Sequence, residues 1–248
     1  PEARTPFAPG EELIYDLSVS GLYLGKVELK VGRPRVIDGR RTESFFGRAR
    51  TSGFASALKS FAGRYMTVVE PDLYHPVELR SEATYGEDAR QEAARFTRDF
   101  RELRTTYRTL GKTANRSYSR DAPVYDMLTL LYHSRRLPLK PGATLCQEVY
   151  ADKRLWRADA QVVGVEQLAT PMGDKAVLKV ATQWKRLPHP DFNPKNEPPW
   201  FDVDIYYTND TYRAPVAFVA RTKDFTARGD LVRWATADRA TEASGWDF

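Results

Sequence analysis

Cysteine and histidine are both scarce, with one Cys and three His among 248 residues. The lone Cys146 cannot form an internal disulfide, and we expect it to be a small buried side chain in a strand. His75, His133 and His189 lack the close spacing of zinc ligands. No run of about 18 apolar residues occurs, so no segment is predicted to span a membrane. The fold is therefore expected to depend on a hydrophobic core, without a metal or a cofactor.

The sequence contains enough apolar residues to form that core. Hydrophobic residues make up 42% of the chain and charged residues 29%, which is typical of a globular protein and too apolar for disorder. We treat residues 1–248 as a single β-rich domain. The chain opens PEARTPFAPG, without Met and without an apolar leader. Such a start is expected of a processed chain, so a missing signal sequence does not indicate the cytoplasm.

Alternation of apolar and polar residues predicts strands along most of the chain. In residues 12–20, Leu13, Tyr15 and Leu17 share one face, and residues 22–31 repeat the pattern. Gly25 indicates a bulge or a close backbone approach. Residues 86–110 are ambiguous, because their Ala, Glu and Arg content favours a helix while residues 103–109 alternate. We interpret them as strands.

One segment, Asp121–Gly142, favours a helix. Asp121 is a plausible N-cap, Pro123 suits the first turn, and Pro138 ends the run. Apolar residues between these points recur at helical spacing. We predict a mainly β fold with one large antiparallel, strongly curved sheet, roll-like or barrel-like, wrapped around a single core α-helix near residues 124–137.

Two features favour ligand binding. Residues 80–120 hold ten Lys and Arg against six Asp and Glu, and tryptophans gather in the C-terminal half, some near the proline-rich loop 187–200. Aromatic faces with nearby arginine suit sugar stacking or a lipid-binding cleft. A solvated charged face and an aromatic core explain the same patterns. The predicted ligand-binding residues are Arg98, Arg101, Arg104, Arg108, Trp184, Trp200 and Phe201.

No catalytic motif is present. The sequence lacks a G-x-S-x-G elbow, a phosphate loop and a dinucleotide fingerprint. Glu11 with Glu12, and Asp202 with Asp204, qualify as paired carboxylates by residue type alone. The HPD segment at 189–191 with the same two aspartates offers oxygen ligands for a cation, but those aspartates also fit the polar face of a strand. We predict no catalytic residues and no metal.

Five short motifs give the chain a family resemblance. It resembles the bacterial domain-of-unknown-function family 3108 (DUF3108), although Thr129 stands where that family has Ser and the 187–200 loop is long. The matching pieces are Phe7–Glu11 with Leu13 and Tyr15, the pair Gly21 and Gly25, Arg136–Leu139 with Gly142, Thr170–Gly173, and Asp210–Val216.

The resemblance implies export to the envelope of a Gram-negative bacterium and a mostly antiparallel β domain, and it supplies no catalytic residues. We predict a non-enzymatic protein of the periplasm or outer envelope. Its partner is expected to be an envelope glycan or lipid, bound through a concave sheet face or the 187–200 loop, and not nucleic acid. Two alternatives stay open: an envelope polysaccharide hydrolase with paired carboxylates, and a module that docks another envelope protein.

Overall fold

The computed structural model describes residues 6–37, 39–53, 55, 56, 60–71, 74–188 and 200–235. Strands dominate them, as the alternation predicts. The elements are β1 (Glu12–Val19), β2 (Leu22–Val31), β3 (Arg35–Ile37), β4 (Arg40–Thr51), β5 (Phe61–Glu70), β6 (His75–Tyr85), β7 (Asp88–Phe96), β8 (Glu102–Thr109), β9 (Lys112–Ser119), β10 (Val124–Asp126), α2 (Met127–Ser134), β11 (Thr144–Ala151), β12 (Arg154–Leu168), β13 (Lys175–Arg186), β14 (Trp200–Thr208), β15 (Pro215–Arg221) and β16 (Thr226–Ala235).

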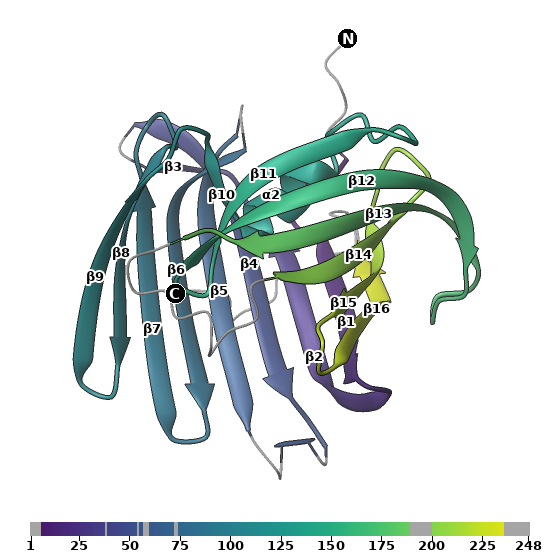
Figure 1. Ribbon diagram of the computed structural model, residues 1–248, viewed down its shortest axis with the longest axis horizontal. Helices are drawn as coiled ribbons and strands as arrows, with labels where there is room; N and C mark the ends of the chain where they lie inside the picture. Colours follow the sequence, from purple (N-terminus) through teal and green to yellow (C-terminus); the bar gives the residue numbers. More distant parts are fainter. Residues whose placement is uncertain are drawn as a thin grey trace.

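These strands form one large sheet that does not close on itself. Its order is β10-β11-β12-β13-β14-β15-β16-β1-β2-β4-β5-β6-β7-β8-β9, with β3 paired to β4 alone. Every ladder is antiparallel except β10–β11, which is parallel. In Figure 1, β11–β14 run across the front of the molecule at a steep angle to the long strands β4–β9, and β7–β9 stand to their left. The sequence prediction of a mainly β, mostly antiparallel sheet is confirmed.

The ambiguous segment 86–110 is a strand pair. Strands β7 and β8 are antiparallel, with Phe96 opposite Leu103. Leu103 and Thr105 are buried while Arg104 and Arg108 are exposed, so alternation overrides the helical composition. Tertiary pairing decides the structure here, as it often does where propensity and periodicity disagree.

Helix α2 begins later than predicted. Residues Val124–Asp126 pair with Glu148–Tyr150 of β11, so they are strand and the expected Asp121 N-cap is wrong. Asp126 is the N-cap, and its carboxylate accepts hydrogen bonds from Leu128 N at 3.0 Å and Thr129 N at 3.2 Å. Thr129 donates its hydroxyl to the same carboxylate, a bond that the Ser expected from the family resemblance would also make.

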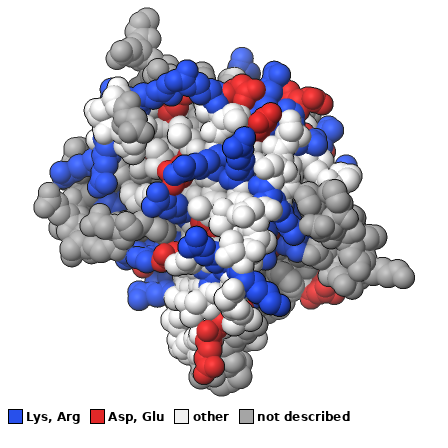
Figure 2. All heavy atoms as spheres, turned by 90° about the vertical axis from the view of Figure 1, so that its left-hand side faces the viewer, with Lys and Arg blue, Asp and Glu red and all other residues white. Residues whose placement is uncertain are grey.

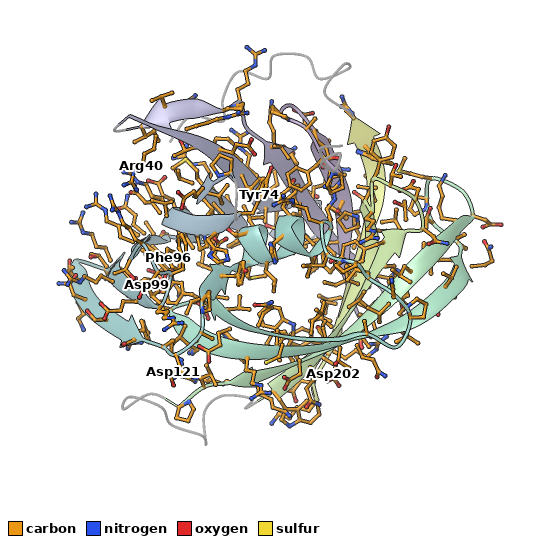
Figure 3. The ribbon with its side chains drawn as sticks, turned by 90° about the horizontal axis from the view of Figure 1, so that it is seen from above. Arg40, Tyr74, Phe96, Asp99, Asp121 and Asp202 are labelled. Atoms are coloured by element: carbon orange, nitrogen blue, oxygen red, sulfur yellow. The ribbon has the colours of Figure 1, made fainter. Side chains whose placement is uncertain are left out.

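The helix packs with Leu128 and Tyr132 in the main core. Tyr132 stacks on Phe45 with ring centroids 4.2 Å apart, and Phe7 meets the Tyr132 ring edge-on at 5.0 Å. Figure 3 shows α2 in the middle of the molecule, with strands on several sides. Burial of these aromatic surfaces contributes a large share of the favourable free energy of folding.

The sequence signal for an irregular strand at Gly25 is confirmed. Gly25 has a positive φ of 157°, and the β1–β2 register shifts beside it. A side chain there would collide with the Arg50 carbonyl oxygen, so only glycine allows this approach of β2 to β4. Pro76 lies next to a second register shift, between β5 and β6. The sequence also predicts a tight turn at Asp38 and a short helix over 52–61. Asp38, Phe54 and residues 57–59, together with most of the 187–200 loop, fall outside the described residues.

Candidate functional site

A wide hollow of about 800 Å³ lies across strands β11–β15. Hydrogen-bond register aligns its residues in a row from Cys146 through Asp159, Gln183 and Asp202 to Arg221, one residue from each strand. We call this feature the β11–β15 groove. Its charged and amide side chains are Arg157, Asp159, Gln161, Gln183, Asp202, Asp204 and Arg221.

The groove is on the face of these strands that points away from helix α2. Trp184, Phe201 and Val203 occupy the other face, in a cluster that includes Leu130 of α2. Side chains alternate between the two faces of a strand, so Asp202 and Asp204 point away from the helix. In Figure 3, Asp202 lies at the rim of the molecule, beyond the strands that separate it from α2.

Charges in the groove are closely balanced. Asp204 accepts from Arg221 at 2.9 Å and lies 3.1 Å from Lys179 Nζ. Arg157 donates to Asp159 at 2.9 Å, and this hydrogen bond lowers the pKa of the Asp159 carboxyl. The lining holds three carboxylates and two guanidiniums. Such a surface offers many directed hydrogen bonds and little net attraction for a polyanion.

Cys146 is exposed at the edge of this groove, which corrects the expectation that it is buried. It does lie mid-strand in β11, as predicted. Partial desolvation and a hydrogen bond with Asp159 raise the pKa of the thiol. A raised pKa keeps the thiol protonated at neutral pH, so nothing here activates it as a nucleophile.

The seven predicted ligand-binding residues do not meet in one place. Arg98 and Arg101 lie in the exposed turn between β7 and β8, and Arg104 and Arg108 lie on the exposed face of β8. Basic side chains prevail on the side of the molecule seen in Figure 2, which looks onto the β9 edge.

The aromatic members are divided as well. Trp184 is buried, with its ring stacked on Phe201 at 5.6 Å on the α2 side of the sheet. Trp200 is 49% exposed and sits two residues before Asp202, on the groove side. The residue opposite Trp200 on the neighbouring strand β13 is Lys185. Only Trp200 among the seven stands beside the groove.

The predicted carboxylate Glu11 has a different role. Arg135 is fully buried and donates to both carboxylate oxygens of Glu11, one of them at 2.9 Å. The guanidinium also donates to the carbonyls of Pro6 and Tyr212. Glu12, the next residue, pairs with Lys30 at 3.1 Å. This buried ion pair, which we call the Arg135 clamp, ties together segments that carry the family resemblance and leaves Glu11 unavailable for acid–base work.

One cluster of histidines could not be found from the spacing of residues in the sequence. His75 and His133 are far apart in the chain, yet their ring centroids lie 6.4 Å apart. Tyr125 lies between them, with its hydroxyl 2.8 Å from His75 Nε2 and 3.5 Å from His133 Nε2. Burial lowers the pKa of His133 to about 4 and also lowers that of His75. Among the described residues, no three His, Cys, Asp or Glu side chains gather closely enough to hold a metal ion.

One family model and one solved structure with a TM-score above 0.5 match this chain. A family model described as a protein of unknown function (DUF3108) matches residues 14–232. A β-barrel-like DUF1849 protein from Brucella abortus aligns with a TM-score of 0.59 and 13% identity, covering 92% of this chain and 98% of the other. A protein with a YmcC-like fold from Bacteroides fragilis aligns with a TM-score of 0.40 and 9% identity, over 93% and 98% of the two chains. A search of curated proteins finds no match.

Proposed function

The chain belongs to the DUF3108 family, and from that premise we propose that it is a non-enzymatic protein of the cell envelope that binds a glycan in the β11–β15 groove. The envelope location is the one that the family resemblance implies. No helix within the described residues is long and apolar enough to cross a bilayer. The observation that carries the proposal is the hollow of about 800 Å³ lined by carboxylate, amide and guanidinium groups.

Groove chemistry favours a sugar over a lipid tail. Sugar hydroxyls donate and accept hydrogen bonds, and the row Asp159–Gln183–Asp202 offers both acceptors and donors at strand spacing. An acyl chain needs a continuous apolar lining, and in this groove small apolar side chains are interspersed with charged and amide groups. Trp200 adds an exposed aromatic face beside Asp202, where a sugar ring can stack. A neutral or zwitterionic glycan fits the balanced charge better than a polyanion does.

Gln183 supplies a sharp test. Its amide donates to Asp202 at 3.4 Å inside the groove. Gln91 on β7 makes a matching 3.4 Å bond to Glu82 on an exposed face away from the groove. We expect Gln183→Leu to weaken binding of muropeptides or delipidated lipopolysaccharide core by about tenfold, the value of one lost hydrogen bond with its partner left unpaired. Gln91→Leu is expected to leave the affinity unchanged.

Isothermal titration with the wild type and both variants measures this. If neither glycan class binds the wild type, or if the two variants weaken binding equally, the proposal fails. Binding of intact lipid vesicles without binding of free glycan would also contradict it.

A hydrolase is the second candidate, because the groove contains the carboxylates that it needs. Asp159 and Asp202 lie on strands separated by one strand, which places their Cα atoms about 10 Å apart. Inverting glycosidases use carboxyl groups at roughly 6.5–9.5 Å. A general acid needs a raised pKa, however, while Arg157 lowers that of Asp159. New reducing ends during incubation with a bound glycan, lost in Asp202→Asn, would favour the hydrolase over the binding protein.

A further inference from the structure

The three carboxylates that line the β11–β15 groove differ in the partners they hold. Asp159 accepts a hydrogen bond from Arg157 at 2.9 Å, and Asp204 accepts one from Arg221 at 2.9 Å. Each of these two carboxylates also has a lysine ammonium within 4 Å. Asp202 is the exception, because no Lys or Arg of the described part of the chain forms an ion pair or a hydrogen bond with it.

The neighbours of Asp202 on both sides leave its acceptor positions open. Arg221 stands directly opposite Asp202 in the β14–β15 ladder, yet its guanidinium is directed to Asp204, two residues along β14. On the other side, the Gln183 amide donates to Asp202 at 3.4 Å, which is long for such a hydrogen bond. A carboxylate offers about four lone-pair positions. Asp202 therefore has room to accept from a ligand in the groove.

An ammonium group is the partner that this carboxylate favours. Hydrogen bonds between an ammonium and a carboxylate are about twice as strong as those between neutral groups, so a sugar hydroxyl would gain less from the same acceptor. The arginines and lysines described in and around the groove are already paired with Asp159 and Asp204, which reduces their repulsion of one incoming cation. A ligand with many cations would still meet them, so the site suits a single ammonium.

Trp200 indicates what carries the ammonium. Its side chain is 49% exposed, on the same face of β14 as Asp202 and two residues away, which is about 7 Å along the strand. A sugar ring stacked on the indole would bring a substituent at its edge within reach of the carboxylate. The indole face attracts a cation as well. A simple alkyl ammonium would gain the ion pair without the stacking.

We propose that the β11–β15 groove selects a glycan in which one sugar carries a free ammonium group, with Asp202 binding the ammonium and Trp200 stacking on the ring. This selection rests on the glycan binding proposed above and adds the ligand class, an amino sugar in preference to its N-acetylated form. Acetylation removes the positive charge and leaves one N–H donor where the ammonium has three.

The test titrates two tetramers of β-1,4-linked N-acetylglucosamine into the full chain by calorimetry. One tetramer is fully acetylated, and the other has a single deacetylated unit. A mildly acidic buffer keeps the sugar amine protonated. The wild type is expected to bind the deacetylated tetramer about tenfold more tightly, as one hydrogen bond between charged groups provides.

Three variants locate the source of this preference. Asp202→Asn keeps the shape of the side chain and removes its charge, so the preference is expected to disappear while the affinity for the acetylated tetramer stays within about twofold. Asp202→Glu retains the charge at a shifted position and is expected to keep part of the preference. Asp16→Asn, a partly exposed carboxylate of β1 that pairs with Lys26, is the matched control and is expected to keep all of it.

Equal affinity of the wild type for both tetramers, or a preference that persists in Asp202→Asn, would overturn the selection and leave glycan binding in the groove intact. Binding of muropeptides but of neither tetramer would do the same. A preference lost equally in Asp16→Asn would also overturn it, because the preference would then come from the charge of the whole protein. If the wild type binds no glycan, the proposed function fails and the selection fails with it. If Asp202→Asn does not fold, a weaker preference in Asp202→Glu than in Asp16→Asn supports the selection, and equal preferences overturn it.

Discussion

The two faces of strands β12–β14 differ sharply although the same backbone carries both. The face toward α2 holds Trp184, Phe201 and Val203 in a packed cluster. The face away from α2 holds Asp159, Asp202 and Asp204 around an open hollow. Because side chains alternate between the two faces of a strand, one face of such a sheet can stabilise the fold while the other face binds a ligand. Neighbouring residues such as Trp200 and Phe201 can therefore have different roles.

The largest expected effect concerns the Arg135 clamp on the α2 side. Glu11→Gln leaves a fully buried guanidinium without its counter-charge, and we expect the free energy of unfolding to fall by about 3–5 kcal/mol. Glu12→Gln is the matched control, because its partner Lys30 remains partly in contact with water. There the loss is expected to stay below about 1 kcal/mol. Urea denaturation measures both, and equal losses would show that the clamp is not special.

Substituting one tryptophan on each face compares the two faces directly. Trp184→Ala removes a buried ring that stacks on Phe201, and we expect a loss of about 3 kcal/mol in the free energy of unfolding. Trp200→Ala removes a half-exposed ring on the groove side, with a loss below about 0.5 kcal/mol. Chemical denaturation of the two variants gives the comparison. A Trp200→Ala variant as unstable as Trp184→Ala would mean that the groove side is also core.

The histidine cluster predicts a dependence on pH. The folded pKa of His133, about 4, lies below its ordinary value near 6.5, so the unfolded chain binds the proton first as pH falls. The contribution of His133 to stability is therefore present above pH 6.5 and is lost as pH falls from 6.5 toward 4. After a discount for partial exposure, we expect this loss to be about 1–2 kcal/mol.

The comparison of wild type with His133→Gln isolates this effect, because buried Asp126 and Glu92 have raised pKa values and act in the opposite direction. Unfolding free energies at pH 7 and at about pH 4.5 are measured for both proteins. The difference between them is expected to shrink at the lower pH. A difference independent of pH would show that His133 titrates normally.

The smallest expected effect is that of salt concentration on the glycan affinity of the groove. Because its carboxylates and cations balance, glycan affinity is expected to change less than about threefold between low and physiological salt. Calorimetric titrations at two salt concentrations measure this, and a strongly salt-dependent glycan affinity would indicate binding on the basic β8 face.

Alternation was enough to predict the strands, including β7 and β8, where composition favoured a helix. It did not reveal that β10 pairs in parallel with β11, so the helix start was misplaced at Asp121 instead of Asp126. That pairing joins residues more than 20 positions apart, and no local signal encodes it.

The site was harder to predict than the fold. Residue type identified Asp202, Asp204 and Trp200 as polar or exposed groups. Their proximity to Asp159 and Gln183, however, depends on the register between strands. Trp184 and Phe201 have the composition of a sugar-stacking pair and prove to be core. The approach of His75 to His133 depends on how the β10–α2 segment packs against β6, which no sequence period describes.

The most direct test maps backbone amide shifts of the full chain during titration with muropeptides or delipidated core oligosaccharide. Our account predicts that the perturbed amides cluster at 144–146, 159–161, 181–183 and 202–204, on four of the five neighbouring strands that line the groove. Perturbations centred on the β7–β8 turn, on the basic face of β8 or around α2, with the groove strands unchanged, would contradict it.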